Sequence, residues 1–132
     1  MKPVLAVLRE HGIQATPQRI AVAECVLASQ THPTADEVWA RVRRTLPTVS
    51  RATVYNTLHL FARKGLLKPQ VLREGIVVFD PCVERHHHFV DIETGKIYDI
   101  PWGAVKVSGH RSLQDFEVRE HQVVLRGRRK KR

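Results

Sequence analysis

The sequence of 132 residues predicts an α+β fold, and three features support this prediction. The first half holds four short segments with apolar residues at helical spacing, each bounded by a capping or terminating residue. Two apolar runs then follow around a glycine-containing turn, which is the pattern of a β-hairpin. The second half holds two further strand-like runs, Phe89–Ile92 and Lys96–Ile100, on either side of a Thr94-Gly95 turn.

The first three helices can be placed from their start signals. The first is predicted over Pro3–Glu10, and Gly12 suits its end. The second begins after Thr16, an N-cap residue that is followed by a proline at the first helical position. Thr34 and Glu37 form a capping box that starts the third helix. Each segment carries an apolar face, so we expect the three helices to pack together.

The fourth helix is predicted from Arg51 to Lys64, with Ser50 as its cap and Gly65 at its end. Its inward positions are apolar: Val54, Leu58 and Phe61. Its opposite face carries a cation, a phenol, an amide and an imidazole but no carboxylate: Arg51, Ala52, Tyr55, Asn56 and His59. Arginine and asparagine can hydrogen-bond base edges in a major groove, and tyrosine can reach a phosphate.

A β-hairpin is predicted directly after this helix. Its runs are Leu66-Leu67 with Val71-Leu72, and Ile76 to Phe79, joined by Arg73-Glu74-Gly75 as a tight turn. Three helices, a helix suited to base recognition and a hairpin make a winged helix-turn-helix. A small helical domain with an ordinary solvated polar face is the alternative interpretation of the same pattern.

The charge is distributed unevenly along the chain. The formal net charge is +9. Residues 1–81 carry 11 basic and 6 acidic side chains, whereas residues 82–125 carry 5 basic and 7 acidic ones. The segment Arg126–Arg132 is basic at six of seven positions. We expect the first part to bind a polyanion, most often nucleic acid, and the tail either to add phosphate contacts or to be a solubilising end.

Composition and cysteine spacing exclude several classes of protein. Hydrophobic residues make up 42% of the chain, which is enough to build a core and excludes general disorder. No apolar run approaches the roughly 20 residues that a membrane span needs, and the N-terminus lacks a secretory signal. Cys25 and Cys82 form neither a CxxC pair nor a disulfide framework. We therefore expect a cytoplasmic protein with free thiols and no membrane association.

Three consecutive histidines begin the strand-like part of the second half. Residues i and i+2 of a strand face the same side, roughly 6–7 Å apart, so His86 and His88 can converge on one ion while His87 points away. Asp99, across the Thr94-Gly95 turn, could project toward the same region. A solvated strand or a hydrogen-bonded histidine cluster is the alternative.

Two further candidate ligands lie in the first half. They are Asp80, at the end of the hairpin, and His32, in the loop before the third helix, whose link to the other ligands depends on the fold. Imidazoles combined with carboxylates make a mixed nitrogen and oxygen site, which suits Fe(II), Mn(II) or Zn(II). The set lacks the thiolates that would favour zinc or Cu(I).

Several motifs occur together, in order, nearly from one end of the chain to the other. They are Thr16-Pro17-Gln18-Arg19, His32-Pro33-Thr34-Ala35-Asp36, Ser50-Arg51-Ala52-Thr53-Val54-Tyr55-Asn56-Thr57-Leu58, the histidine run, Gly95-Lys96-Ile97, and Phe116-Glu117-Val118 with His121. In these motifs the chain resembles the Fur (ferric uptake regulator) family of bacterial metal-dependent repressors.

The resemblance implies a division of the chain into three parts. These are a winged-helix DNA-binding domain over residues 1–80, a dimerisation and metal-sensing α/β domain over residues 81–125, and a basic tail over residues 126–132. It also implies a hinge near Asp80–Pro81. From the resemblance and the helix pattern together, we expect DNA contacts from Arg19, Ser50, Arg51, Thr53, Tyr55 and Asn56.

The resemblance also implies one regulatory divalent metal per subunit, Fe(II) or Mn(II), with Zn(II) possible in vitro. The ligands carried over are His32, Asp80, His86, His88 and Asp99. Aspartate at position 99 is similar to the peroxide-regulator branch, whereas iron-responsive members commonly have glutamate there. In that branch, His32 or His86 would be oxidised by iron-catalysed chemistry and DNA would then be released.

The sequence departs from the family pattern in three places. Many members bind a structural zinc through two CxxC pairs, but here Asp91 and Thr94 replace the first pair and the second is absent, so we expect no structural zinc held by four cysteines. The positions of an auxiliary metal site hold cations and histidines, which argues against a strong third site: Arg85, His87, Lys106 and His121. The segment Pro101–Asp115 is short and glycine-containing, so its helix is expected to be short or poorly formed.

The sequence thus predicts a homodimeric, metal-dependent repressor that binds a palindromic double-stranded operator and senses peroxide. An iron- or manganese-responsive repressor without peroxide chemistry is one alternative. A small non-haem iron enzyme is the alternative from another class, because two histidines and one carboxylate also form the facial triad of oxygenases. We expect a regulator and not an enzyme, since the ligands would saturate the ion and the basic face would otherwise be unexplained.

Overall fold

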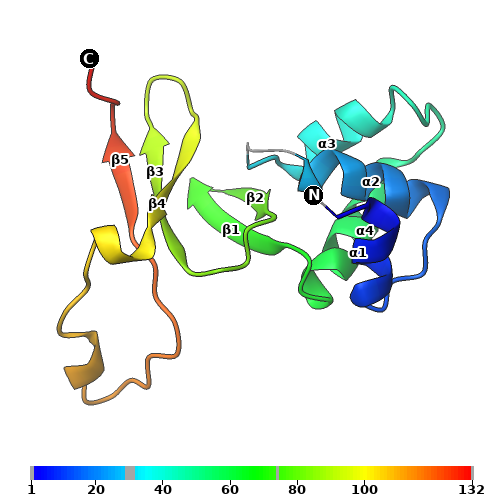
Figure 1. Ribbon diagram of the computed structural model, residues 1–132. Coiled ribbons are helices and arrows are strands. Elements are labelled where there is room, and N and C mark those ends of the chain that lie inside the picture. The colour runs from blue at the N-terminus through cyan, green and yellow to red at the C-terminus, as the bar shows by residue number, and fades with distance from the viewer. Residues whose placement is uncertain (1, 29–31, 74, 132) are drawn as a thin grey trace. The chain divides into compact units, whose positions relative to one another are not determined.

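The computed structural model describes residues 2–28, 32–73 and 75–131. It divides into two compact units, Met1–Val83 and Glu84–Arg132. Among these described residues, the first unit holds four helices and a two-stranded sheet, and the second holds a three-stranded sheet (Figure 1). In the described residues, no helix combines the length and the apolar character that crossing a membrane requires.

Three helices of the first unit begin at the capping residues that the sequence predicts, whereas α1 follows Pro3 without a side-chain cap. Thr16 accepts a hydrogen bond from the Arg19 backbone N–H, and Ser50 accepts one from the Thr53 N–H. The capping box of Thr34 and Glu37 is present in both directions. The four helices are α1 (Val4–Glu10), α2 (Pro17–Leu27), α3 (Ala35–Val42) and α4 (Arg51–Arg63).

The apolar faces of these helices enclose one core. The predicted inward residues of α4, Val54, Leu58 and Phe61, are fully buried. Val22 of α2 is fully buried as well. Burying a side chain of this kind contributes about 1.5–3 kcal/mol relative to leaving it exposed, so the core dominates the stability of this unit.

The hairpin after α4 consists of β1 (Lys68–Arg73) and β2 (Ile76–Asp80), paired antiparallel. The predicted turn includes Glu74, which lies outside the described residues. A backbone bridge between Thr34 and Val78, and a hydrogen bond from the Phe79 N–H to the Pro33 carbonyl (2.9 Å), attach β2 to the segment before α3. The unit is therefore the winged helix-turn-helix that the sequence predicts.

The sheet of the second unit has the order β4-β3-β5. Its strands are β3 (His86–Asp91), β4 (Ile97–Pro101) and β5 (Val124–Gly127). β3 and β4 pair antiparallel with His88 opposite Asp99, whereas β5 runs parallel to β3. The predicted turn is present, since Gly95 has a positive φ of 76°. β3 begins three residues earlier than the predicted strand Phe89–Ile92, because its ladder to β4 extends over the histidines.

A long excursion separates β4 from β5 and leaves the sheet before returning to it (Figure 1). Within its described residues the helical structure consists of two single 3-10 turns, Trp102–Ala104 and His110–Ser112. This agrees with the expectation of a short or poorly formed helix in this segment. The sequence pattern did not predict β5, which includes Arg126 and Gly127 of the predicted basic tail.

Candidate functional site

Three predicted metal ligands lie together in the second unit. His86 and His88 occupy alternate positions of β3, so both project from the same face of the sheet. Their ring centroids are 4.5 Å apart. The Nε2 atoms of His86 and His88 lie 3.5 Å and 3.9 Å from Oδ1 of Asp99 on β4. The strand period and the β3–β4 register thus bring two imidazoles and one carboxylate close together.

Hydrogen bonds determine which ring nitrogen of each histidine carries the proton. Nδ1 of His86 lies 2.7 Å from the Glu84 carbonyl oxygen, and Nδ1 of His88 lies 3.0 Å from Oε1 of Gln122. Because these oxygens only accept, each Nδ1 is the donor, and in the neutral imidazole the lone pair is then on Nε2. Histidines that ligate metals are commonly oriented in this way by a second hydrogen bond. The donor set therefore fits a divalent cation at the position that both Nε2 atoms and Asp99 face.

His87 points away from this cluster, as predicted, and it is fully buried. Its Nδ1 accepts a hydrogen bond from the Val123 N–H (2.9 Å), so its Nε2 carries the proton and donates to the Val105 carbonyl (3.1 Å). Its ring stacks on Trp102, with centroids 4.5 Å apart and planes inclined by 15°. Both ring nitrogens are thus used to hold the excursion between β4 and β5 against the sheet.

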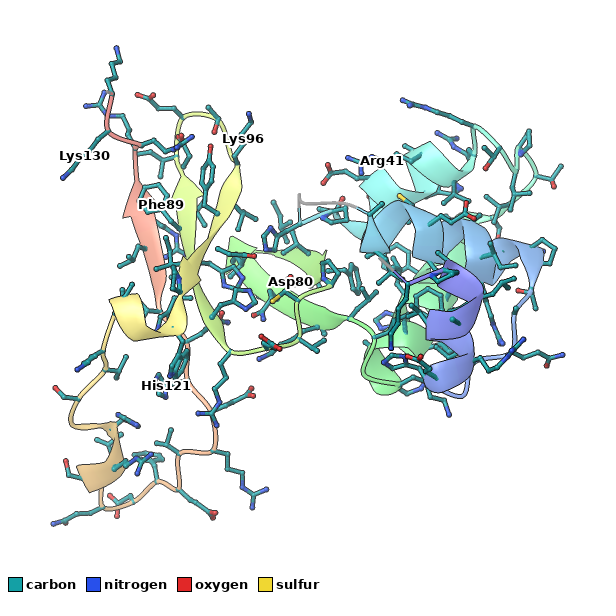
Figure 2. The ribbon with its side chains drawn as sticks, viewed as in Figure 1. Arg41, Asp80, Phe89, Lys96, His121 and Lys130 are labelled. Carbon is teal, nitrogen blue, oxygen red and sulfur yellow. The ribbon has the colours of Figure 1, made fainter. Side chains whose placement is uncertain are left out.

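The other two predicted ligands lie together in the first unit. Nε2 of His32 is 3.1 Å from Oδ2 of Asp80, and both side chains are nearly inaccessible to solvent. Oδ1 of Asp80 accepts a hydrogen bond from the Cys82 backbone N–H (2.9 Å). Asp80 is labelled at the end of β2 in Figure 2. The attachment of β2 to Pro33 places this carboxylate beside His32 across 48 positions of sequence.

Asp91, which replaces a cysteine of the family pattern that the sequence resembles, has a local structural role. Its Oδ1 accepts hydrogen bonds from the backbone N–H groups of Glu93 (2.8 Å) and Thr94 (3.2 Å). The Glu93 N–H is the main reason that the pKa of Asp91 lies below its usual value, and the Thr94 N–H lowers it further. The carboxylate therefore closes the β3–β4 turn.

Three of the six predicted DNA-contact residues line one cleft of the helix-turn-helix. A cleft of about 390 Å³ lies between the start of α2 and α4 and contains Arg19, Thr53 and Asn56. The Arg19 guanidinium donates to the Gln14 carbonyl, which holds it at the rim of α2 (2.9 Å). Ser50 is occupied as the cap of α4, where its Oγ also lies 2.8 Å from the Thr53 hydroxyl. These side chains therefore reach the surface from two helices that are adjacent in the fold.

Arg51 is paired with an aspartate that the sequence pattern did not assign to this surface. Its Nε lies 2.8 Å from Oδ1 of Asp36 on α3, and its Nη2 donates to Oδ2 at 3.1 Å. Its Cζ lies 5.4 Å from the centroid of the Tyr55 ring. Hydrogen bonding with Tyr55, and then the charge of Asp36, raise the pKa of Arg51 above its usual value. The face of α4 carries no carboxylate of its own, but α3 supplies one.

Two residues that shape these sites could not be found from the sequence, and the reason is the same for both. Asp36 accepts a hydrogen bond from Arg51, 15 positions away on another helix, and Gln122 accepts one from His88 across 34 positions. Neither lies in a spacing pattern with its partner. The capping box beside Asp36 indicates a helix start, not a contact with α4.

Comparisons with known proteins agree on one family. The family model described as the ferric uptake regulator family matches residues 10–126. The peroxide-responsive repressor PerR of Staphylococcus aureus (strain Mu50) is 33% identical over 127 residues, which cover 93% of this chain and 84% of that protein.

Two solved structures are similar over almost the whole chain. The ferric uptake regulator from Pseudomonas aeruginosa with manganese has a TM-score of 0.72 and 25% identity, covering 98% of this chain and 100% of that one. The Campylobacter jejuni peroxide stress regulator has a TM-score of 0.66 and 27% identity, covering 99% of this chain and 98% of that one. The family model matches most of this chain. The chain, with its winged-helix unit and its histidine-bearing sheet, therefore belongs to the ferric uptake regulator family.

Proposed function

We propose that this protein is a metal-dependent, DNA-binding repressor that senses peroxide. The observation that carries the proposal is the orientation of His86 and His88, whose Nδ1 atoms donate to fixed acceptors while their Nε2 atoms face Asp99. Family membership and the similarity to peroxide-responsive regulators support the repressor and the signal. Such a repressor acts in the cytoplasm, where a bacterium keeps its DNA.

The proposed regulatory ion takes ligands from both units of one subunit. We infer that His32 and Asp80 complete the set begun by His86, His88 and Asp99, with Fe(II) or Mn(II) as the physiological ion. An ion that needs all five ligands favours the conformation that brings them together. If only that conformation binds the ion, an ion concentration 100 times its dissociation constant stabilises it by about 2.7 kcal/mol.

Peroxide sensing is proposed to occur at the ligands themselves. The proposed ligands would hold Fe(II), which would supply one-electron reduction of hydrogen peroxide beside the imidazoles and would regain that electron as the ring is oxygenated. The net change is that one imidazole C–H and one hydrogen peroxide give an oxygenated ring and water. Oxidation of His32 or His86 would remove a ligand, weaken ion binding and release DNA.

DNA binding is proposed to involve two copies of the chain on a palindromic operator. A symmetric dimer places its two recognition helices in half-sites about one helical turn apart. Arg19, Arg51, Tyr55 and Asn56 would contact the phosphates and base edges of each half-site. The C-terminal unit would form the dimer contact.

The test of the repressor function is operator binding as a function of bound metal. An operator is first selected from a randomised duplex library with Mn(II)-loaded protein, and its affinity is then measured before and after chelation. We expect chelation to weaken binding at least tenfold, and Mn(II) to restore it. Unchanged affinity would exclude a metal-dependent switch.

The test of the peroxide signal is mass spectrometry of the Fe(II)-loaded protein after treatment with hydrogen peroxide. We expect a mass gain of one oxygen atom on the peptide that contains His32 or His86, and no gain with Mn(II). Asp99→Glu should remove the oxidation and keep repression. If the Fe(II) protein shows no oxygenated histidine, it is an iron- or manganese-responsive repressor without peroxide chemistry.

A small non-haem iron enzyme is the second candidate, favoured by the two histidines and one carboxylate of the second unit. The candidates are separated by assaying the Fe(II) protein for oxygen consumption with small organic acids in parallel with operator binding. Turnover without metal-dependent DNA binding would favour the enzyme.

A further inference from the structure

The ion pair between Asp36 and Arg51 has little to contribute to the fold. Both side chains are more than half exposed, with 59% and 56% of their surface accessible. Exposed ion pairs of this kind add little to stability, because water screens the charges and the side chains lose rotamer freedom. The pair is nevertheless held by two contacts to separate carboxylate oxygens, Nε to Oδ1 and Nη2 to Oδ2. The geometry of the pair therefore indicates a role in orienting Arg51.

The contacts determine which part of the guanidinium faces outward. Arginine presents five N–H donors in one plane. Asp36 occupies the edge formed by Nε–H and one Nη2–H. Tyr55, one turn along α4, restricts the guanidinium from a second direction. Asp36 does not engage the N–H groups at the opposite end, on Nη1 and on the second Nη2 hydrogen, and more than half of the side chain is exposed, so this end can meet acceptors outside the protein beside the Tyr55 contact.

We propose that Asp36 is a specificity-determining residue that orients Arg51 to read a guanine in the major groove. This inference rests on the proposed DNA-binding function. Guanine presents O6 and N7 as adjacent acceptors on its major-groove edge, and a bidentate arginine matches them. An arginine already held in place loses less conformational entropy on binding and is less able to turn toward a phosphate.

The charge of Asp36 adds a second effect of opposite sign. A carboxylate that α3 supplies beside the start of α4 repels the phosphates of any duplex, whatever its sequence. Removing it should therefore strengthen binding to unrelated DNA and weaken discrimination at the guanine. A variant that simply folds poorly would lose both binding to unrelated DNA and discrimination at the guanine. Stronger binding to unrelated DNA together with weaker discrimination therefore distinguishes an orienting role from a structural one.

The experiment uses the full-length Mn(II)-loaded protein and an operator selected from a randomised duplex library. Each base pair of the operator is substituted in turn, and affinities are compared for the wild type and Arg51→Ala. The guanine read by Arg51 is the position where substitution lowers the affinity of the wild type about tenfold or more and leaves the affinity of Arg51→Ala unchanged. Asp36→Ala and Asp36→Asn are then measured at that position and on an unrelated duplex.

We expect Asp36→Ala to reduce discrimination at that guanine to about twofold and to bind the unrelated duplex several-fold more tightly. Asp36→Asn should be intermediate, because its amide oxygen still accepts one hydrogen bond. The matched control is Glu24→Ala, which removes one exposed carboxylate from α2 in the same unit and should discriminate like the wild type.

Two results would overturn the inference while leaving the proposed repressor intact. One is an Asp36→Ala protein that discriminates at the guanine as well as the wild type. The other is an Arg51→Ala protein that still distinguishes every base pair of the operator. A selection in which the metal-loaded protein enriches no duplex would instead refute the DNA-binding function on which the inference rests.

Discussion

The two units of this protein are stabilised by different means. The N-terminal unit buries a continuous set of aliphatic and aromatic side chains beneath its helices. In the described part of the C-terminal unit, the hydrophobic side chain that is buried is Val90, and the other buried residues are His87, His88 and Asp91. The first unit thus has a core of its own, whereas hydrogen bonds between buried polar groups organise the second.

The C-terminal unit also leaves large apolar side chains at its surface. They are Ile92, Leu113, Phe116, Val118 and Leu125. Phe89 and Tyr98 lie on the same face of the sheet as Leu125, since these three are paired across the strands. Figure 2 labels Phe89 on this sheet. Exposed apolar groups gathered on a small unit are typical of an interaction surface, which supports the proposed homodimer.

The largest effect is expected from a cavity in the helical core. Phe61→Ala removes a fully buried ring, and its loss should lower the free energy of unfolding by about 3–5 kcal/mol. Urea denaturation followed by circular dichroism of the helices measures this change. Val71→Ala, at a position 64% exposed on β1, is the control and should cost less than about 0.5 kcal/mol. Equal losses in the two variants would mean that the helical core is not the source of stability.

The next effect concerns the polar network of the C-terminal unit. Gln122→Leu removes the acceptor that orients His88, and we expect Mn(II) affinity to fall about 10–100-fold. Metal titration by calorimetry measures the change. Gln114→Leu, an exposed glutamine in the same excursion, is the matched control and should bind Mn(II) like the wild type. Wild-type affinity in Gln122→Leu would show that His88 does not depend on this hydrogen bond.

A smaller effect is expected at the exposed apolar surface. Leu125→Asp places a charge on β5 and should weaken self-association about tenfold or more, without altering the unfolding of the helical unit. Sedimentation equilibrium at several concentrations gives the dimer constant. Leu5→Asp makes the same change at an exposed position of α1 and should leave self-association unchanged. Loss of dimers in both variants alike would argue against a contact at β5.

The smallest effect is a dependence of stability on pH. Burial, followed by the neighbouring His110, lowers the pKa of His121. The folded state therefore binds this proton less tightly than the unfolded chain does. The contribution of neutral His121 to the free energy of unfolding is retained above about pH 6.5, and it declines as the pH falls below that value.

Thermal melting between about pH 7.5 and about pH 5.5 tests this dependence. His121→Gln should flatten the profile of the C-terminal unit. His59→Gln, an exposed histidine of the other unit, should leave the profile as it is in the wild type. A wild-type slope in His121→Gln would assign the dependence to another group.

Local rules were sufficient for much of the fold. The N-caps at Thr16, Thr34 and Ser50 and the spacing of Val54, Leu58 and Phe61 predicted the helical unit, because capping and amphipathic spacing involve residues within a few positions of each other. The strand period and a two-residue turn likewise predicted that His86, His88 and Asp99 would share one region of a sheet, although the strand begins earlier than expected.

Contacts between distant segments could not be predicted in the same way. The sequence by itself determined the helix starts, the core face of α4 and the histidine pair on one strand, since each depends on backbone geometry over a few residues. Only the tertiary structure placed Asp36 on Arg51, Gln122 on His88 and β5 beside β3. The position of Asp80 beside His32 was implied by the family resemblance but by no residue spacing. Those contacts depend on how whole elements pack, and no residue spacing encodes the packing.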